Sequence, residues 1–195
     1  ERCIFMNSLW LNSFNKNYIN KLDSDCSCDV CIIGAGIFGL SCAYYLSNLG
    51  YNVIVVDKNG IGRRATGHTT AKITSQHGLF YDYLINSFNK KFASDYLEAN
   101  ENAIENIKNI IDNNNIKCDF EYQNSFVYTT KKSELSVLKK EYKALENIGF
   151  NNCEFVTKTG LPFNVEGALC FKNQAKFNPV KYLYGLSDFI LSHNG

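Results

Sequence analysis

The feature that most constrains this chain is a run from Val30 to Val56 without a single charged residue. The run is long enough to cross a bilayer. However, three glycines near its start, the Ser47-Asn48 pair and the turn at Gly50 divide it into a strand, a helix and a second strand, each too short to span. We therefore expect a β–α–β unit here rather than a membrane helix.

The residue pattern defines the three elements of this unit. Residues 29–33 are typical of a short buried strand, and the four apolar residues of the next segment recur at helical spacing up to Gly50: Leu40, Ala43, Tyr44 and Leu46. Residues 53–56 are all β-branched, which is typical of a parallel strand covered on both faces. The sequence predicts one β–α–β unit over residues 29–57, with a right-handed crossover.

The glycines form the motif G-x-G-x-x-G at residues 34–39, between the first strand and the helix. In this motif the first glycine permits a tight turn, the second lets the backbone approach a pyrophosphate, and the third lets helix and strand pack closely. Asp57 ends the second strand, where a carboxylate accepts hydrogen bonds from an adenosine ribose. The sequence thus predicts a dinucleotide site. The acid disfavours the 2′-phosphate of NADP, and NAD and FAD both remain open.

Composition excludes several other classes of protein. The 195 residues are 45% hydrophobic and carry a net charge of +1, which fits a folded protein and not a nucleic-acid binder. Eight cysteines in a chain with long periodic segments indicate reduced thiols, and the spacing of Cys26, Cys28 and Cys31 is not that of a zinc site. Residues 1–20 contain no apolar core of a signal peptide, so we expect a cytoplasmic protein. We take Met6, the only methionine, as the hypothetical natural initiator.

The rest of the chain alternates helices and strands. We expect an irregular loop over 59–70 and then a long amphipathic helix that ends at 113–115, with an apolar stripe of Phe92, Tyr96, Ala99, Ala103, Ile107, Ile110 and Ile111. Strands are predicted near 120–128, 154–157 and 168–172. Ser133 is the expected cap of a helix that ends at Gly149, and Asn178-Pro179 opens a last helix, after which an α/β chain should continue with a strand.

Three segments together resemble a known family. VCIIGAGIFGLSCAYYL, VIVVDK and ATGHTTAKITSQHG are similar to the D-amino-acid-oxidase-type superfamily of FAD-dependent oxidoreductases, and the resemblance extends from Ser8 to the helix at Asn178. More narrowly, the chain resembles bacterial glycine/D-amino-acid oxidase-like proteins that often carry a C-terminal Rieske domain. The resemblance implies FAD as cofactor and oxidation of an amine or amino-acid C–N bond by hydride transfer to the flavin.

The resemblance also implies roles for individual residues. The pyrophosphate would lie against Gly34, Ala35, Gly36, Ile37 and Gly39. Asp57 would bind the ribose with Lys58 beside it, and Thr66, Thr69 and Thr70 would lie along the ribityl and pyrophosphate side. Arg63 and Arg64 stand where the family has small residues, so a phosphate contact and a solvated charge both remain open. The candidates near the reacting end of the flavin are His68, Lys72 and His77, and no catalytic residue is assigned.

The predicted fold class is α/β, with a Rossmann-like FAD/NAD(P)-binding domain and part of an antiparallel β-rich substrate domain. We expect an N-terminal arm over 1–28, the FAD-binding part with the long helix over 29–116, a partial substrate domain over 117–165, and a return to the FAD-binding domain over 166–195. The aromatic residues of the substrate part could line a pocket or fill a core, and we favour a core: Phe120, Tyr122, Phe126 and Tyr128.

The family's second flavin-contacting segment, its C-terminal Gly-Asp segment and the Rieske ligands are not in this sequence. We therefore expect an N-terminal portion of the enzyme, inactive alone, whose partners are an amine or amino-acid substrate and a downstream Rieske domain or another electron-transfer partner. The alternatives are an NAD-dependent dehydrogenase and a non-catalytic nucleotide-binding remnant.

Overall fold

The computed structural model of the protein describes residues 8–14, 16, 21–193 and 195, so Met6 lies outside the described residues. The fold is mixed α/β, with one parallel and one antiparallel sheet. The chain forms two compact units. The first unit comprises the described residues of 1–71, 110–120 and 177–195, and the second comprises 72–109 and 121–176.

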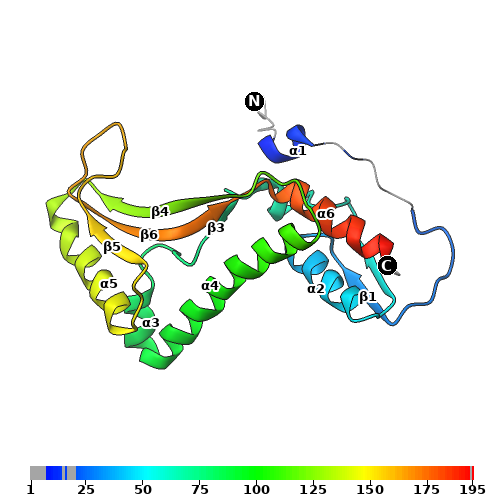
Figure 1. Ribbon diagram of the computed structural model, residues 1–195, viewed down its shortest axis with the longest axis horizontal. Coiled ribbons are helices and arrows are strands. Elements are labelled where there is room, and N and C mark those ends of the chain that lie inside the picture. Colours follow the sequence, from blue (N-terminus) through cyan, green and yellow to red (C-terminus); the bar gives the residue numbers. More distant parts are fainter. Residues whose placement is uncertain (1–7, 15, 17–20, 194) are drawn as a thin grey trace, which may run out of the picture. The chain divides into compact units, whose positions relative to one another are not determined.

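The first unit contains the predicted β–α–β segment (Figure 1). Its elements are α1 (Leu9–Ser13), β1 (Val30–Ile33), α2 (Ile37–Asn48), β2 (Val53–Val56), the short 3₁₀ helix η1 (Ala65–His68) and α6 (Pro179–Ser192). Strands β1 and β2 pair in parallel from Val30↔Val53 to Ile33↔Val56. The charge-free run is therefore a strand, a helix and a strand, as predicted. None of the helices among the described residues has both the length and the apolar character needed to cross a membrane.

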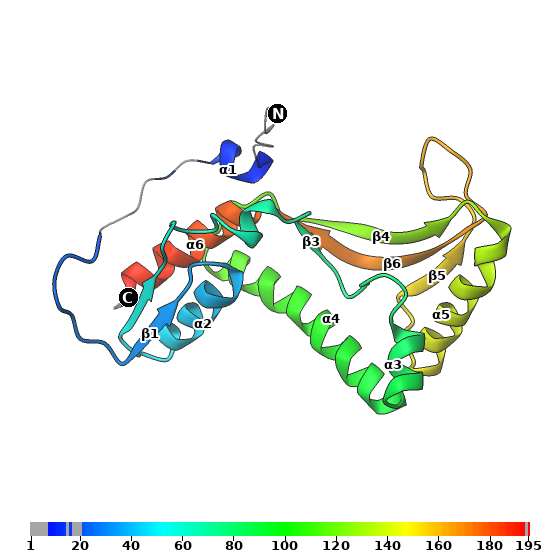
Figure 2. The same ribbon diagram turned by 180° about the vertical axis from the view of Figure 1, so that it is seen from behind.

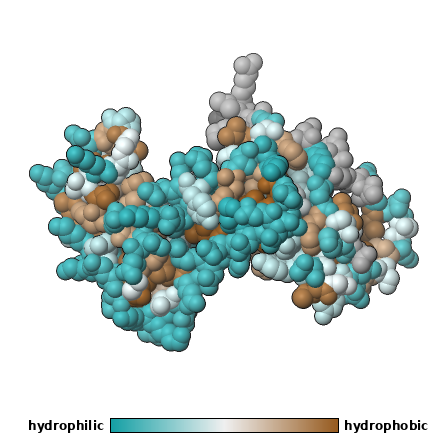
Figure 3. All heavy atoms as spheres, viewed as in Figure 1, coloured by the Kyte–Doolittle hydropathy of each residue, from teal (hydrophilic) through white to brown (hydrophobic). Residues whose placement is uncertain are grey.

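One face of the β1–β2 sheet is less covered than the sequence predicts. Val53 is fully buried, but the rest of β2 is only partly buried, and Ile33 is 89% exposed. The expectation of a strand covered on both faces is therefore not met by β2 among the described residues, where the sheet has two strands. Figure 3 shows hydrophobic patches among hydrophilic atoms on the visible face of the molecule.

Helix α6 packs against α2 and covers its buried side. The rings of Tyr44 and Phe189 lie 4.5 Å apart between centroids. Asn178 caps α6 by accepting hydrogen bonds from the N–H groups of Val180 and Lys181, and Pro179 occupies the first turn. This confirms the predicted start of the helix, which ends at Ser192.

The second unit is an antiparallel sheet with helices on one side (Figure 2). Its elements are β3 (Lys72–Ile73), α3 (Tyr81–Ser87), most of α4 (Lys90–Asn113), β4 (Glu121–Thr129), the 3₁₀ helix η2 (Lys132–Glu134), α5 (Leu135–Asn147), β5 (Cys153–Val156) and β6 (Gly167–Lys176). β6 is central and pairs with the other three strands. The core between sheet and helices contains Tyr81, Leu84, Leu97, Leu145, Leu169 and Phe171. Residues 72–109, which the sequence-based division placed with the FAD-binding part, pack within this unit.

Two details of the helices correct the sequence analysis. In α4 the buried stripe contains Ala93, Leu97 and Ile104, whereas Phe92 is 44% exposed, because the contacts with the core set the orientation of the helix. Ser133 does not cap α5. It lies inside η2, the residue at the cap is Glu134, and no side chain there accepts a capping hydrogen bond.

Strand β3 and helix α3 were not predicted. The first turn of α3 is held by a carboxylate that is distant in sequence. Glu141, 1% exposed, accepts hydrogen bonds from the N–H groups of Phe80 and Tyr81, each at 2.7 Å, and of Asp82 at 2.8 Å. No local pattern in the sequence marks this contact, because Glu141 and α3 are about 60 residues apart.

Candidate functional site

The turn between β1 and α2 requires glycine at two positions. Gly34 has φ +113°, which side chains rarely adopt. A Cβ at Gly39 would lie 1.9 Å from the carbonyl oxygen of Gly34, so the backbones of strand and helix touch there. Gly36 differs, because a Cβ there would meet only Thr66 Oγ1 at 3.4 Å. The middle glycine thus leaves a surface that a ligand can approach.

The start of α2 presents backbone donors at this surface. The N–H groups of Gly36, Phe38 and Gly39 have no hydrogen-bond partner among the described residues, as is usual in the first turn of a helix. The Ile37 N–H donates to Thr66 Oγ1 at 3.1 Å. Unpaired N–H groups at the positive end of the helix dipole form a site suited to a phosphate anion.

Asp57 lies directly after β2, and its carboxylate contacts the glycine turn. Oδ2 accepts from the Ala35 N–H at 2.9 Å, while Oδ1 accepts from the N–H groups of Asn59 at 2.7 Å and Gly60 at 2.9 Å. Partial burial raises the pKa of the carboxyl, but these hydrogen bonds and the charge of Arg64 outweigh it, so the pKa lies below the usual value. A carboxylate accepts about four hydrogen bonds, so one position remains on Oδ2.

The loop after Asp57 folds back onto the glycine turn. The Gly62 N–H donates to the Ala35 carbonyl at 2.9 Å, and Thr66 bonds to Ile37 as described above. Arg64 lies near Asp57, and when the Asn59 amide oxygen is turned toward it, that oxygen accepts from Arg64 Nε at 2.9 Å. Lys58, Arg63, Thr69 and Thr70 are exposed. Of the predicted loop residues, the structure thus brings Thr66 into contact with the glycine turn.

The three residues predicted near the reacting end of the flavin are divided between the two units. His68 lies in the first unit, where its Nδ1 is 2.9 Å from the Arg64 carbonyl oxygen, as in a histidine that holds a loop. Lys72 and His77 belong to the second unit. His77 Nδ1 is 2.6 Å from the hydroxyl oxygen of Tyr96.

The second unit contains a cavity of about 300 Å³ on its sheet. Its lining includes Lys72, Thr74, Ser125, Phe126, Tyr128 and Lys176. Phe126 is 38%, Tyr128 44% and Tyr122 49% exposed, so the expectation that these aromatics fill a core is wrong for all three. Phe126 and Tyr128 pair with Cys170 and Ala168 of β6 and lie on the face of the sheet that points away from the helices. Their neighbours in β4 pair with Phe171 and Leu169, which belong to the core under the helices.

Helix α1 is a part of the site that the sequence analysis missed. Trp10 Nε1 donates to the Thr69 carbonyl oxygen at 2.8 Å, and the Ser8 hydroxyl donates to the Gly67 carbonyl oxygen. Ser8 also caps α1 by accepting from the Leu11 N–H. The local signal was Ser8 three residues before Leu11, but a five-residue helix gives too little periodicity to recognise.

The cysteines and the metal-binding residue types form no site in the described part of the chain. The seven described cysteines are free thiols, with Cys26 and Cys31 exposed and Cys118, Cys153 and Cys170 buried. No group of three or more His, Cys, Asp or Glu side chains gathers there in a way that would hold a metal ion.

The sequence is similar to those of several known proteins. A Bacillus subtilis (strain 168) protein, YhfW, which carries the name of a Rieske 2Fe-2S iron–sulfur protein, is 36% identical over 95% of this chain and 36% of its own length. Gamma-glutamylputrescine oxidoreductase of Escherichia coli (strain K12) is 26% identical over 90% of this chain and 42% of its own length. The chain thus spans well under half the length of these relatives.

The fold is also similar to that of a solved structure. The crystal structure of glycine oxidase from Bacillus cereus matches with a TM-score of 0.67 and 16% identity, over 86% of this chain and 46% of that one. The family described as FAD dependent oxidoreductase, abbreviated DAO, matches residues 29–195, which include the glycine turn, Asp57, the whole second unit and the part of the first unit that follows residue 28. The chain therefore belongs to the DAO family of FAD-dependent oxidoreductases.

Proposed function

We propose that this chain is the N-terminal portion of an enzyme that oxidises the C–N bond of an amine or amino acid by hydride transfer to FAD. The observation that carries the proposal is the family match over residues 29–195, joined to a glycine turn whose donors fit a dinucleotide. The match favours FAD over NAD as the cofactor. Relatives named for a gamma-glutamylputrescine and a glycine reaction support an amine or amino-acid substrate.

The residues of the turn fit the ADP part of FAD. Gly36 has no side chain to block the approach, and the N–H groups of Gly36, Phe38 and Gly39 would bind the pyrophosphate. The remaining acceptor position on Asp57 Oδ2 would take one ribose hydroxyl. Lys58 would lie beside the ribose, and Thr66 would lie along the pyrophosphate. When bound, FAD supplies the acceptor for the hydride that leaves the substrate carbon.

In the second unit, Lys72 supports a substrate with a carboxylate. It lines the cavity on the sheet together with the aromatic rings of Phe126 and Tyr128, which combines a cation with apolar surface. An amino acid presents both features, whereas a simple amine has no anionic group for the lysine. In the enzyme, Lys72→Gln should therefore raise KM for an amino acid more than for the corresponding amine, with Lys132→Gln, an exposed lysine outside the cavity lining, as the control.

The test uses the protein expressed with the coding sequence that follows Gly195 in its gene. A bound flavin identified as FAD, and bleached anaerobically by an amine or amino acid, would support the proposal. The Gly36→Ala variant should fold but purify with far less flavin, because the methyl group occupies the phosphate surface. A stop codon directly after Gly195 would support the non-catalytic remnant. Protein that binds NAD and no flavin would support the dehydrogenase, and either result would refute the proposal.

A further inference from the structure

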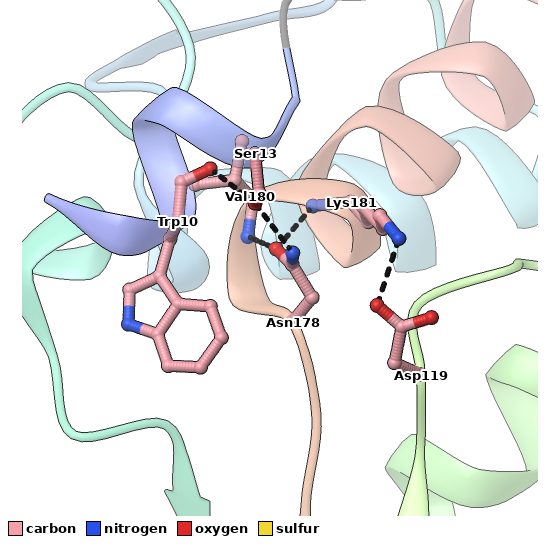
Figure 4. A network of polar contacts seen from close by, with 6 residues as sticks. All are labelled: Trp10, Ser13, Asp119, Asn178, Val180 and Lys181. Carbon is pink, nitrogen blue, oxygen red and sulfur yellow. Dashed lines mark hydrogen bonds and ion pairs between the residues drawn. The ribbon is translucent and has the colours of Figure 1, made fainter.

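Helix α1 connects two segments of the first unit that are far apart in the sequence. At its start, Ser8 and Trp10 donate to the carbonyl oxygens of Gly67 and Thr69 in the loop after β2. At its end, the Ser13 hydroxyl accepts from the side-chain amide of Asn178 at 3.1 Å. Asn178 is the 3% exposed cap of α6 (Figure 4).

The loop segment that α1 contacts is tightly packed. A Cβ at Gly67 would lie 2.2 Å from the Gly62 carbonyl oxygen and 3.0 Å from a methyl carbon of Leu11. Gly67 is therefore enclosed between its own loop on one side and α1 on the other. The contact between α1 and the loop is therefore close enough to leave no room for a side chain at position 67.

The same loop reaches the glycine turn through two hydrogen bonds. The Gly62 N–H donates to Ala35, and Thr66 Oγ1, next to Gly67, accepts from the Ile37 N–H. A continuous set of contacts thus runs from Ser8 and Trp10 to the first turn of α2. The opposite end of α1 is fixed through Asn178, whose N–H also donates to the Cys118 carbonyl at 2.6 Å. Beside it, Lys181 pairs with Asp119 at 2.7 Å (Figure 4).

We propose that α1 holds the loop of residues 59–70 in place. Ser8 and Trp10 are positioning residues in this proposal, because their hydrogen bonds to the loop keep Thr66 in contact with the start of α2. This inference rests on the proposed function, because it takes the start of α2 as the pyrophosphate site. Without the hydrogen bonds from α1, Thr66 would no longer be held in one position. The backbone N–H groups at the start of α2 would then be less preorganised for the pyrophosphate. The free energy needed to order the loop would then be taken from FAD binding.

The test compares Trp10→Phe and Ser8→Ala in the full 195-residue chain. Trp10→Phe keeps an aromatic ring and removes the Nε1–H donor, and Ser8→Ala removes both the cap and the bond to Gly67. Ser8→Thr restores a hydroxyl and should restore the wild-type behaviour. Leu9→Ala is the matched control, because Leu9 lies on the same helix with its side chain 68% exposed.

The first readout is amide hydrogen exchange at Ile37 and Gly62, which needs no cofactor. We expect faster exchange at both amides in Trp10→Phe and Ser8→Ala. Leu9→Ala and Ser8→Thr should exchange like the wild type. Unchanged exchange in folded variants would overturn the proposal. This outcome does not depend on whether the chain binds FAD. It therefore tests the positioning role of α1 separately from the proposed function.

The second readout is FAD affinity, measured by titration with flavin fluorescence. Loss of one hydrogen bond should weaken binding by about two- to tenfold. Combined with Thr66→Val, Trp10→Phe should weaken binding little further, because both changes act on the same contact. Fully additive effects, or wild-type affinity in both α1 variants when the wild type binds FAD, would refute the positioning role.

Discussion

The short distance between Gly39 and the carbonyl oxygen of Gly34 gives a sharp test of the glycine turn. In Gly39→Ala the new methyl carbon would start 1.9 Å from the Gly34 carbonyl oxygen, and real contacts of this kind do not fall below 3.0 Å. The helix and the strand would have to separate by about 1.1 Å, and neither contacting atom belongs to a flexible side chain. Ile32, whose methyl group would lie at 3.3 Å, restricts the movement further.

The expected cost follows from these contacts. Overpacking of a rigid site costs typically about 1–3 kcal/mol, and a backbone clash belongs at the upper end. Alanine gains about 1 kcal/mol over glycine in helix propensity, which offsets part of this. We expect the free energy of unfolding to fall by about 2 kcal/mol. Gly36→Ala, at φ −88° and with only Thr66 Oγ1 in contact, should change it by under about 1 kcal/mol.

Urea unfolding followed by tryptophan fluorescence measures this difference. Trp10 is the only tryptophan of the chain and contacts Thr69 in the first unit, so its emission reports that unit. With a slope of about 1–2 kcal/mol per M, the midpoint of Gly39→Ala should lie about 1–2 M below wild type. Equal midpoints for Gly39→Ala and Gly36→Ala would refute the close contact between strand and helix.

Further predictions concern both units. Glu141→Gln should destabilise the second unit by about 2–3 kcal/mol, seen as a lower melting temperature by circular dichroism, because a neutral amide cannot accept the three N–H groups as well; an unchanged melting temperature would contradict this. Cys26 should react rapidly with a thiol reagent under native conditions, whereas Cys153, whose burial raises its pKa to about 12, should react only after unfolding. Burial also raises the pKa of Cys118 to about 11. The stability contributed by this buried neutral thiol should be complete below pH ~8.5 and should decline at higher pH, where the thiol of the unfolded chain ionises first. Asp57 has a lowered pKa, so its contribution is present above pH ~4 and is lost as the pH falls through the folded value; Asp57→Asn should flatten the acid limb of stability measured by Trp10 fluorescence.

The sequence predicted those parts of the fold whose causes are local. The β–α–β unit has its own periodicity, and the glycine spacing and the Asn178-Pro179 cap each act within a few residues. Elements that depend on hydrogen bonds with residues far away in the sequence were not predicted. α3 depends on Glu141, and α1 depends on Gly67 and Thr69, so neither shows in a short window of sequence.

The same distinction applies to the candidate site. The place of Asp57 after β2 follows from the motif, but its three backbone hydrogen bonds do not, because they depend on how residues 59–60 turn back toward Ala35. Phe126 and Tyr128 alternate as a strand should, yet alternation does not tell which face is covered. Only the helices on the other face decide that.

The discontinuous first unit has a consequence for synthesis on the ribosome. The glycine turn and β2 emerge early, but α6, which packs against α2, begins about 130 residues after the end of α2. At about 5–20 residues per second, roughly 6–26 s pass between the synthesis of α2 and the synthesis of the first residues of α6. The second unit is made from the stretch between these segments, which is interrupted only by residues 110–120 of the first unit. The second unit can therefore fold first, while Tyr44 of α2 still lacks the ring of Phe189 against which it packs in the folded protein.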